Sequence, residues 1–125
     1  MPELHAENRA LIEGLRRALK ACALAGETMT YNELAQRLDF PGPHRIHRLT
    51  ELLEVTIRED HAAGRPLLAA LAVSRSQNGV PGRGFFHLLA ELGRYDGPDQ
   101  GPEAAEAHAV ELKAAIAYWR AAAPD

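Results

Sequence analysis

An uninterrupted apolar run from Leu67 to Val73 constrains the fold of this 125-residue chain more than any other stretch. Seven consecutive apolar residues are typical of a strand that is buried on both faces. Asn78-Gly79 follows the run and predicts a tight reversal, because glycine adopts a positive φ at no steric cost and asparagine does so at little cost. A proline and two glycines within residues 81–84 predict a short, irregular return arm. We therefore expect one β-hairpin, and the sequence gives no other convincing β signal.

The residues before the hairpin predict three helices. The first spans residues 4–25 and ends before Gly26, which suits the position just after a helix. Thr30-Tyr31-Asn32-Glu33 is a capping box that predicts the start of a short second helix. The third helix is expected to begin near Pro43 or His44 and to run to about Ala63. Its inward stripe consists of Ile46, Leu49, Leu53 and Ile57, with Leu52 alongside.

Two further helices are expected after the hairpin. Phe85 to Leu92 forms a short one, and residues 96–102 form a linker rich in glycine and proline. Pro102 suits the first position of an alanine-rich final helix that ends near Ala122. We expect this helix to dock on the first helix or on a second subunit through an apolar face of Ala105, Ala109, Leu112, Ile116 and Trp119. The predicted organisation is a domain over 1–95, a linker over 96–102 and a C-terminal helix over 103–125.

Chain length, the N-terminal sequence and the cysteine count together predict a small cytoplasmic protein. The chain is long enough for one domain with a substantial core, and no apolar run reaches the roughly 18 residues of a membrane span. Its N-terminus lacks the features of a signal peptide, and the single cysteine, Cys22, has no intramolecular disulfide partner. Cys22 falls on the apolar stripe of the first helix, so we expect it to be buried and unreactive.

Charge is distributed unevenly along the chain, whose formal net charge is −3. Residues 41–94 contain seven basic and five acidic residues, a net charge of +2, whereas residues 95–125 contain two and six, a net charge of −4. The middle third is therefore the better place for a polyanionic partner.

A short helix, a tight turn and a longer helix with a basic beginning are typical of a helix-turn-helix pair. With a following hairpin, the order predicts an α+β, mostly helical, winged helix-turn-helix fold with added N- and C-terminal helices. The segment Tyr31-Asn32-Glu33-Leu34-Ala35 and the helix and strand after it resemble the DNA-binding domain of the alkyltransferase-like proteins, over residues 28–86. The resemblance implies DNA binding. It gives no support for alkyl transfer, because the Pro-Cys-His-Arg segment of the alkyltransferase enzymes has no counterpart here.

The candidate DNA-binding residues lie in two places. The first turns of the third helix would enter the major groove, where arginine can make a bidentate contact with guanine. The hairpin would meet phosphates or the minor groove. These residues are His44, Arg45, His47 and Arg48 on the helix, and Arg75 and Arg83 beside the hairpin tip. The alternative for each group is a solvated polar surface without a ligand.

Other functions have weaker support in the sequence. His44, His47 and Glu51 share a helix face that could hold a metal, but no second cluster accompanies them. Without a nucleophile motif or a nucleotide-binding loop, we predict a non-enzymatic protein without cofactor or metal. The main prediction is a small transcriptional regulator or DNA-processing accessory that binds double-stranded DNA. The alternative is a protein–protein interaction module on the same scaffold, and the apolar terminal helices are compatible with a homodimer.

Overall fold

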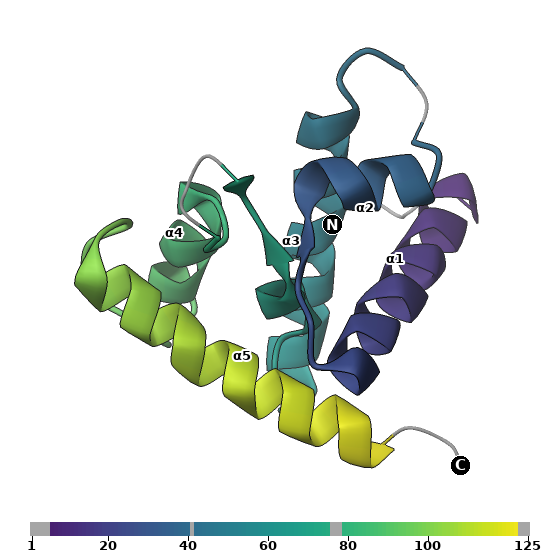
Figure 1. Ribbon diagram of the computed structural model, residues 1–125. Coiled ribbons are helices and arrows are strands. Elements are labelled where there is room, and N and C mark those ends of the chain that lie inside the picture. Colours follow the sequence, from purple (N-terminus) through teal and green to yellow (C-terminus); the bar gives the residue numbers. More distant parts are fainter. Residues whose placement is uncertain (1–5, 41, 76–78, 123–125) are drawn as a thin grey trace.

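The computed structural model describes residues 6–40, 42–75 and 79–122 (Figure 1). Within these ranges the chain is α+β and mostly helical, as predicted. Its elements, in order, are α1 (Ala6–Ala25), β1 (Met29–Thr30), α2 (Tyr31–Arg37), α3 (Arg45–Ala62), the 3-10 helix η1 (Leu68–Leu71), β2 (Ala72–Val73), α4 (Arg83–Glu91) and α5 (Pro102–Ala122).

Local signals set the junction from α1 to α2 as predicted. Gly26 has a φ of +71° directly after α1, and the amide of Glu27 donates to the carbonyl of Cys22 at 3.0 Å, which closes the helix end. At the start of α2, Thr30 Oγ1 accepts from the amide of Glu33 at 3.2 Å. The Glu33 carboxylate accepts from the amide of Thr30 at 3.1 Å, so the capping box is confirmed. The amide and the hydroxyl of Thr30 both donate hydrogen bonds to the Glu33 carboxylate, and these bonds lower the pKa of that carboxyl.

The apolar run from Leu67 to Val73 is buried throughout, but the prediction of a strand over the whole run is wrong. Leu68–Leu71 is a 3-10 helix, and only Ala72–Val73 is extended. Helices α1, α3 and α5 all pack against η1, so the run is enclosed on every side. A continuous apolar stretch fits a buried helical turn as well as a buried strand.

The β-structure also differs from the predicted hairpin. β1 was not predicted, because two residues are too short to show a period. It pairs in parallel with β2, with Met29 opposite Ala72 and Thr30 opposite Val73. Among the described residues, the reversal after β2 contains one antiparallel bridge, in which the amide of Ser74 donates to the carbonyl of Val80 at 2.8 Å. Gly79 has a φ of +81°, and Asn78, the other residue of the predicted turn, lies outside the described residues.

The last two helices are close to their predicted positions, but α5 presents a different face to the core. α4 begins two residues earlier than predicted, at Arg83, and α5 begins at Pro102 as expected. α5 packs on α1 and η1 along the lower edge of the view in Figure 1. Its buried residues are Ala104, His108, Ala115 and Trp119. Of the predicted face only Trp119 is buried, while Ala105 and Ala109 are exposed. The prediction ranked residues by apolarity and so excluded His108, whose imidazole lies 2.8 Å from the carbonyl of Ala70 and is accommodated in the core.

A buried carboxylate ties α1, α3 and the segment before β2 together. Asp60, near the end of α3, is fully buried. Its Oδ1 accepts hydrogen bonds from Arg16 Nη1 at 3.0 Å and from Arg65 Nη2 at 2.9 Å. Its Oδ2 accepts from the amide of Leu68 at 3.2 Å. These contacts fix η1 relative to α3 and thereby set the position of β2.

Candidate nucleic-acid interface

A groove forms where the start of α2, the first turn of α3 and the end of β2 meet. Its volume is about 1180 Å³, which includes space that is open to solvent. β1 and α2 supply most of its wall, α3 supplies one residue and the segment after β2 supplies two. The lining residues are Thr30, Tyr31, Asn32, Glu33, Gln36, Ile46, Ser74 and Arg75. The parallel pairing of β1 with β2 positions the groove, because it holds Thr30 beside Val73, the residue before Ser74.

The basic beginning of α3 borders this groove. His44 is the N-cap residue, and the first turn of α3 contains no acidic residue. Ile46 lines the groove, so the first turn of α3 faces it between Arg45 and His47. His47 is exposed, and its Nε2 lies 3.7 Å from a carboxylate oxygen of Glu51. His44, Arg45 and His47 flank Ile46 in the sequence, but they are not among the residues that line the groove.

Arg48 has a different environment from its neighbours. Its guanidinium donates a hydrogen bond to the side-chain oxygen of Asn8 on α1. Its Nε is buried and has no hydrogen-bond partner in the described part of the chain. Arg48 is thus half-buried between α3 and α1, where it contributes to helix packing.

The two arginines beside the predicted hairpin tip are separated. Arg75 is exposed and lines the groove, where its charge helps to keep the pKa of Glu33 low. Arg83 is the first residue of α4, and its Nη2 donates to Oε1 of Gln100 at 2.9 Å. Arg83 is exposed but is not among the lining residues of the groove. The structure therefore brings Arg75, and not Arg83, to the first turn of α3.

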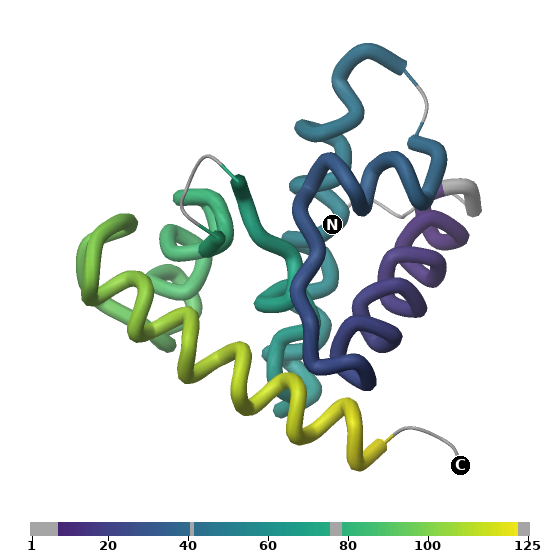
Figure 2. The backbone as a smooth tube through the Cα atoms, viewed as in Figure 1, coloured from purple at the N-terminus to yellow at the C-terminus, as the bar shows by residue number. Residues whose placement is uncertain are grey.

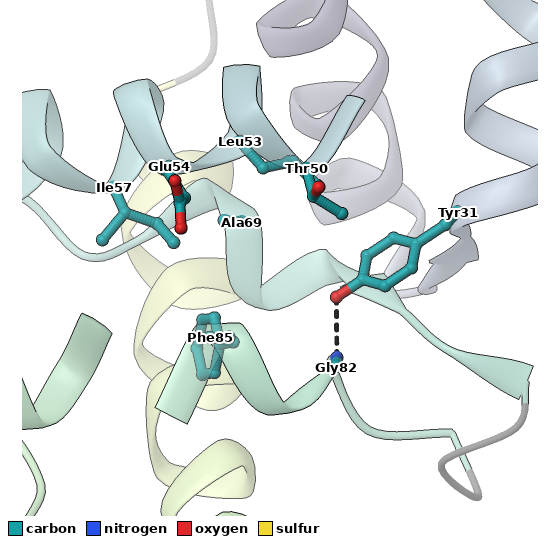
Figure 3. Close-up of a pocket in the computed structure, with 9 residues that line it drawn as sticks. Tyr31, Thr50, Leu53, Glu54, Ile57, Ala69, Gly82 and Phe85 are labelled. Atoms are coloured by element: carbon teal, nitrogen blue, oxygen red, sulfur yellow. Dashed lines mark hydrogen bonds between the residues drawn. The ribbon is translucent and has the colours of Figure 1, made fainter. Parts of the chain in front are cut away.

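A second, smaller pocket adjoins the groove through Tyr31 (Figure 3). α3 forms one side and the start of α4 forms the other, with Glu54 and Ile57 projecting toward Phe85 in Figure 3. The Tyr31 hydroxyl accepts a hydrogen bond from the amide of Gly82 at 2.8 Å. Burial raises the pKa of the Tyr31 phenol, so this group is neutral at physiological pH. Tyr31 thus fixes the start of α4 against α2 and forms part of both cavities.

The sequence interpretation missed three groove residues on α2. Tyr31 and Asn32 were named only within the capping box and the segment that carries the resemblance, and Gln36 was not considered. Asn32 and Gln36 are exposed and four residues apart, so they lie on one face of α2. Asparagine and glutamine side chains commonly contact phosphates and adenine bases. The spacing of two amides on the helix before the basic helix was the available signal.

Other chemistry has little support within the described residues. Over residues 6–40, 42–75 and 79–122, no three His, Cys, Asp or Glu side chains come together in a way that could hold a metal. Cys22 is buried as predicted, and burial raises the pKa of its thiol. A thiol with a raised pKa is a poor nucleophile at neutral pH.

Comparison with protein-family models, with curated proteins and with solved structures finds no match to this chain. Of the helices that the structure describes, none has the length and apolarity needed to cross a membrane.

Proposed function

We propose that this chain binds double-stranded DNA through the groove between α2, the first turn of α3 and the segment after β2, as a winged helix-turn-helix protein. One observation carries the proposal: Arg75 lines the groove together with Ile46, which belongs to a helix beginning that has basic residues around it and no acidic residue in its first turn. The element order supports the proposal, because a short α2 is followed by a longer α3. Residues 38–44 connect these helices, which is a longer connection than the tight turn that the sequence predicts.

Each side of the groove has a defined part in this proposal. The amides of α3's first turn and the side chains of Arg45 and His47 meet the edges of bases or the flanking phosphates. Arg75 and the side-chain amides of Asn32 and Gln36 contact the sugar-phosphate backbone of the DNA on either side. Glu33, the acidic residue in the groove, is engaged by Thr30 in the capping box and by the charge of Arg75.

The test is a titration of fluorescently labelled duplex DNA of random sequence, followed by anisotropy at several salt concentrations. Binding through phosphates weakens steeply as salt rises. Such binding releases counterions that are condensed on the DNA, and this release is less favourable when the salt concentration is high. Arg75→Ala is expected to weaken binding on all sequences and to reduce the salt slope by about 1. Arg45→Ala is expected to cost about 1–3 kcal/mol on a selected site and less on random DNA.

Arg17→Ala is the matched control. Arg17 is an exposed arginine on α1 that does not line the groove, so its removal changes the net charge equally. If Arg17→Ala weakens binding as much as Arg75→Ala, the groove is not the binding surface. If the wild-type chain does not bind DNA even at low salt, the proposal is wrong, and a protein–protein interaction module becomes the better hypothesis.

A further inference from the structure

One side of α5 carries an apolar strip that the core covers only in part. Figures 1 and 2 show α5 along one edge of the molecule, passing from the α4 side to the end of α1. A shallow hollow on this helix is lined only by α5 residues: Ala109, Leu112, Lys113, Ile116, Ala117 and Arg120. Leu112 and Ile116 touch the core but remain half-exposed, while Ala105 and Ala109 are exposed. We call Ala105, Ala109, Leu112 and Ile116 the α5 strip.

We propose that the α5 strip binds the same strip of a second copy of this chain, with the two helices antiparallel about a twofold axis. The proposal does not depend on DNA binding. Twofold pairing places one surface against itself, so the strip must be complementary to its own reversed sequence. Both the sizes and the charges of its side chains meet this requirement.

The sizes are complementary in one register. Small residues occupy the first half of the strip, at Ala105 and Ala109, and large residues occupy the second half, at Leu112 and Ile116. In an antiparallel pair centred near residue 110, Leu112 lies opposite Ala109 of the second copy, and Ile116 lies opposite Ala105 of the second copy. Alternating large and small residues let two helices approach closely and interdigitate.

The charges are complementary in the same register. Glu106 and Lys113 lie on the same side of the strip, one in each half of α5, and both are exposed. Neither enters a hydrogen bond or an ion pair within the described part of the chain. In the antiparallel pair each Glu106 faces Lys113 of the second copy, and the twofold axis repeats this contact. Parallel pairing would place this side of the strip against the opposite side of the partner's strip, where neither ion pair can form, so the charge pattern favours the antiparallel arrangement.

The test is the mass of the full chain in solution, measured by sedimentation velocity at low salt. An interface of one helix from each copy is at the small end of specific interfaces, so we expect a dimer that forms between about 1 and about 500 μM. Ala109→Glu places a charged, bulky side chain at the centre of the strip. We expect it to weaken the dimer at least tenfold without unfolding the chain, since Ala109 is exposed.

The control is Val110→Glu. Val110 is 65% exposed and follows Ala109, so it projects about 100° further around the helix, away from the strip. This variant adds the same charge to α5 and is expected to dimerise like the wild type.

Charge reversal tests the register. Glu106→Lys replaces both ion pairs with like charges and is expected to weaken the dimer about tenfold, because each exposed pair contributes up to a few-fold. The double variant Glu106→Lys with Lys113→Glu is expected to restore wild-type dimerisation. A wild-type chain that stays monomeric to about 500 μM, the upper end of the expected range, overturns the proposal. So does a dimer that Ala109→Glu leaves unchanged, or a double variant no better than the single one.

Discussion

Replacement of Asp60 is expected to destabilise the fold, because it removes buried polar contacts. Asp60→Asn keeps the shape of the side chain but removes its charge, and only one oxygen remains as an acceptor. Either the amide of Leu68 or the guanidinium groups of Arg16 and Arg65 must then lose a buried partner. Removing one side of a buried ion pair costs about 3–5 kcal/mol.

The exposure of the two arginines sets the magnitude within that range. The side chains of Arg16 and Arg65 are 15% and 35% exposed, whereas that of Asp60 is 0% exposed. Water can therefore recover part of the lost interaction, and we expect a loss of about 3 kcal/mol. Domains of this size are stable by about 5–15 kcal/mol, so the variant remains folded with a clearly lower denaturant midpoint.

The assay is equilibrium unfolding in urea, followed by circular dichroism and by the fluorescence of Trp119, the only tryptophan. Trp119 reports on this region, because its Nε1 donates to the carbonyl of Pro66 and its ring lies 5.7 Å from the Arg65 guanidinium carbon. Glu59→Gln is the matched control. Glu59 is the neighbouring residue and also pairs with Arg16, at 2.9 Å, but its side chain is 33% exposed.

Burial decides the comparison between these two neighbours. Exposed or partly exposed pairs contribute about 0–1 kcal/mol, so Glu59→Gln is expected to cost no more than about 1 kcal/mol. Equal losses for the two variants would refute the argument that burial of Asp60 makes its contacts strong. A loss below about 1 kcal/mol for Asp60→Asn would show that these contacts do not hold the fold together.

Three further variants test individual contacts. Thr30→Ala removes the helix cap of α2 and is expected to lower the free energy of unfolding by about 1 kcal/mol in urea titration; no change would exclude a stabilising cap. Tyr31→Phe removes the acceptor for the Gly82 amide and is expected to cost about 1 kcal/mol, measured in the same way, and an unchanged free energy of unfolding would contradict a stabilising role for this hydrogen bond. Burial lowers the pKa of His108 in the folded chain, so stability should fall as pH drops below about 6.5 towards that lowered pKa, since the unfolded chain binds the proton more readily. His108→Gln should lose less stability than the wild type between pH values of about 7.5 and 5 in parallel urea titrations, and equal losses would assign the pH dependence to other groups.

The sequence alone determined the elements whose signals are local. The capping box at Thr30, the glycine after α1 and the proline that begins α5 each act within a few residues of chain. The 3.6-residue period of α3 likewise placed its inward stripe correctly, from Leu49 to Ile57. Such signals depend on backbone geometry and short-range hydrogen bonds, so they can be recognised without knowledge of the tertiary structure.

The candidate site was only partly predictable from the sequence. The basic beginning of α3 and Arg75 are local features, and the structure places Arg75 in the same groove as Ile46 of that first turn. The inward position of Arg48 depends on Asn8, 40 residues earlier, and the part of Tyr31 in two cavities depends on Gly82, 51 residues later. No pattern within a helix reports partners at such separations.

Tertiary structure alone decided which conformation the central apolar run adopts and which side of α5 is buried. The run at 67–73 satisfies a buried strand and a buried turn equally, and its packing inside α1, α3 and α5 selects the turn for Leu68–Leu71. On α5, alanine occurs on several faces, so apolarity does not show which face is buried. The buried face is the one that contains His108, whose imidazole lies within hydrogen-bond distance of the carbonyl of Ala70. Both outcomes follow from the same physical fact. Burial satisfies backbone and side-chain groups through neighbours distant in the chain, and apolarity by itself does not identify those neighbours.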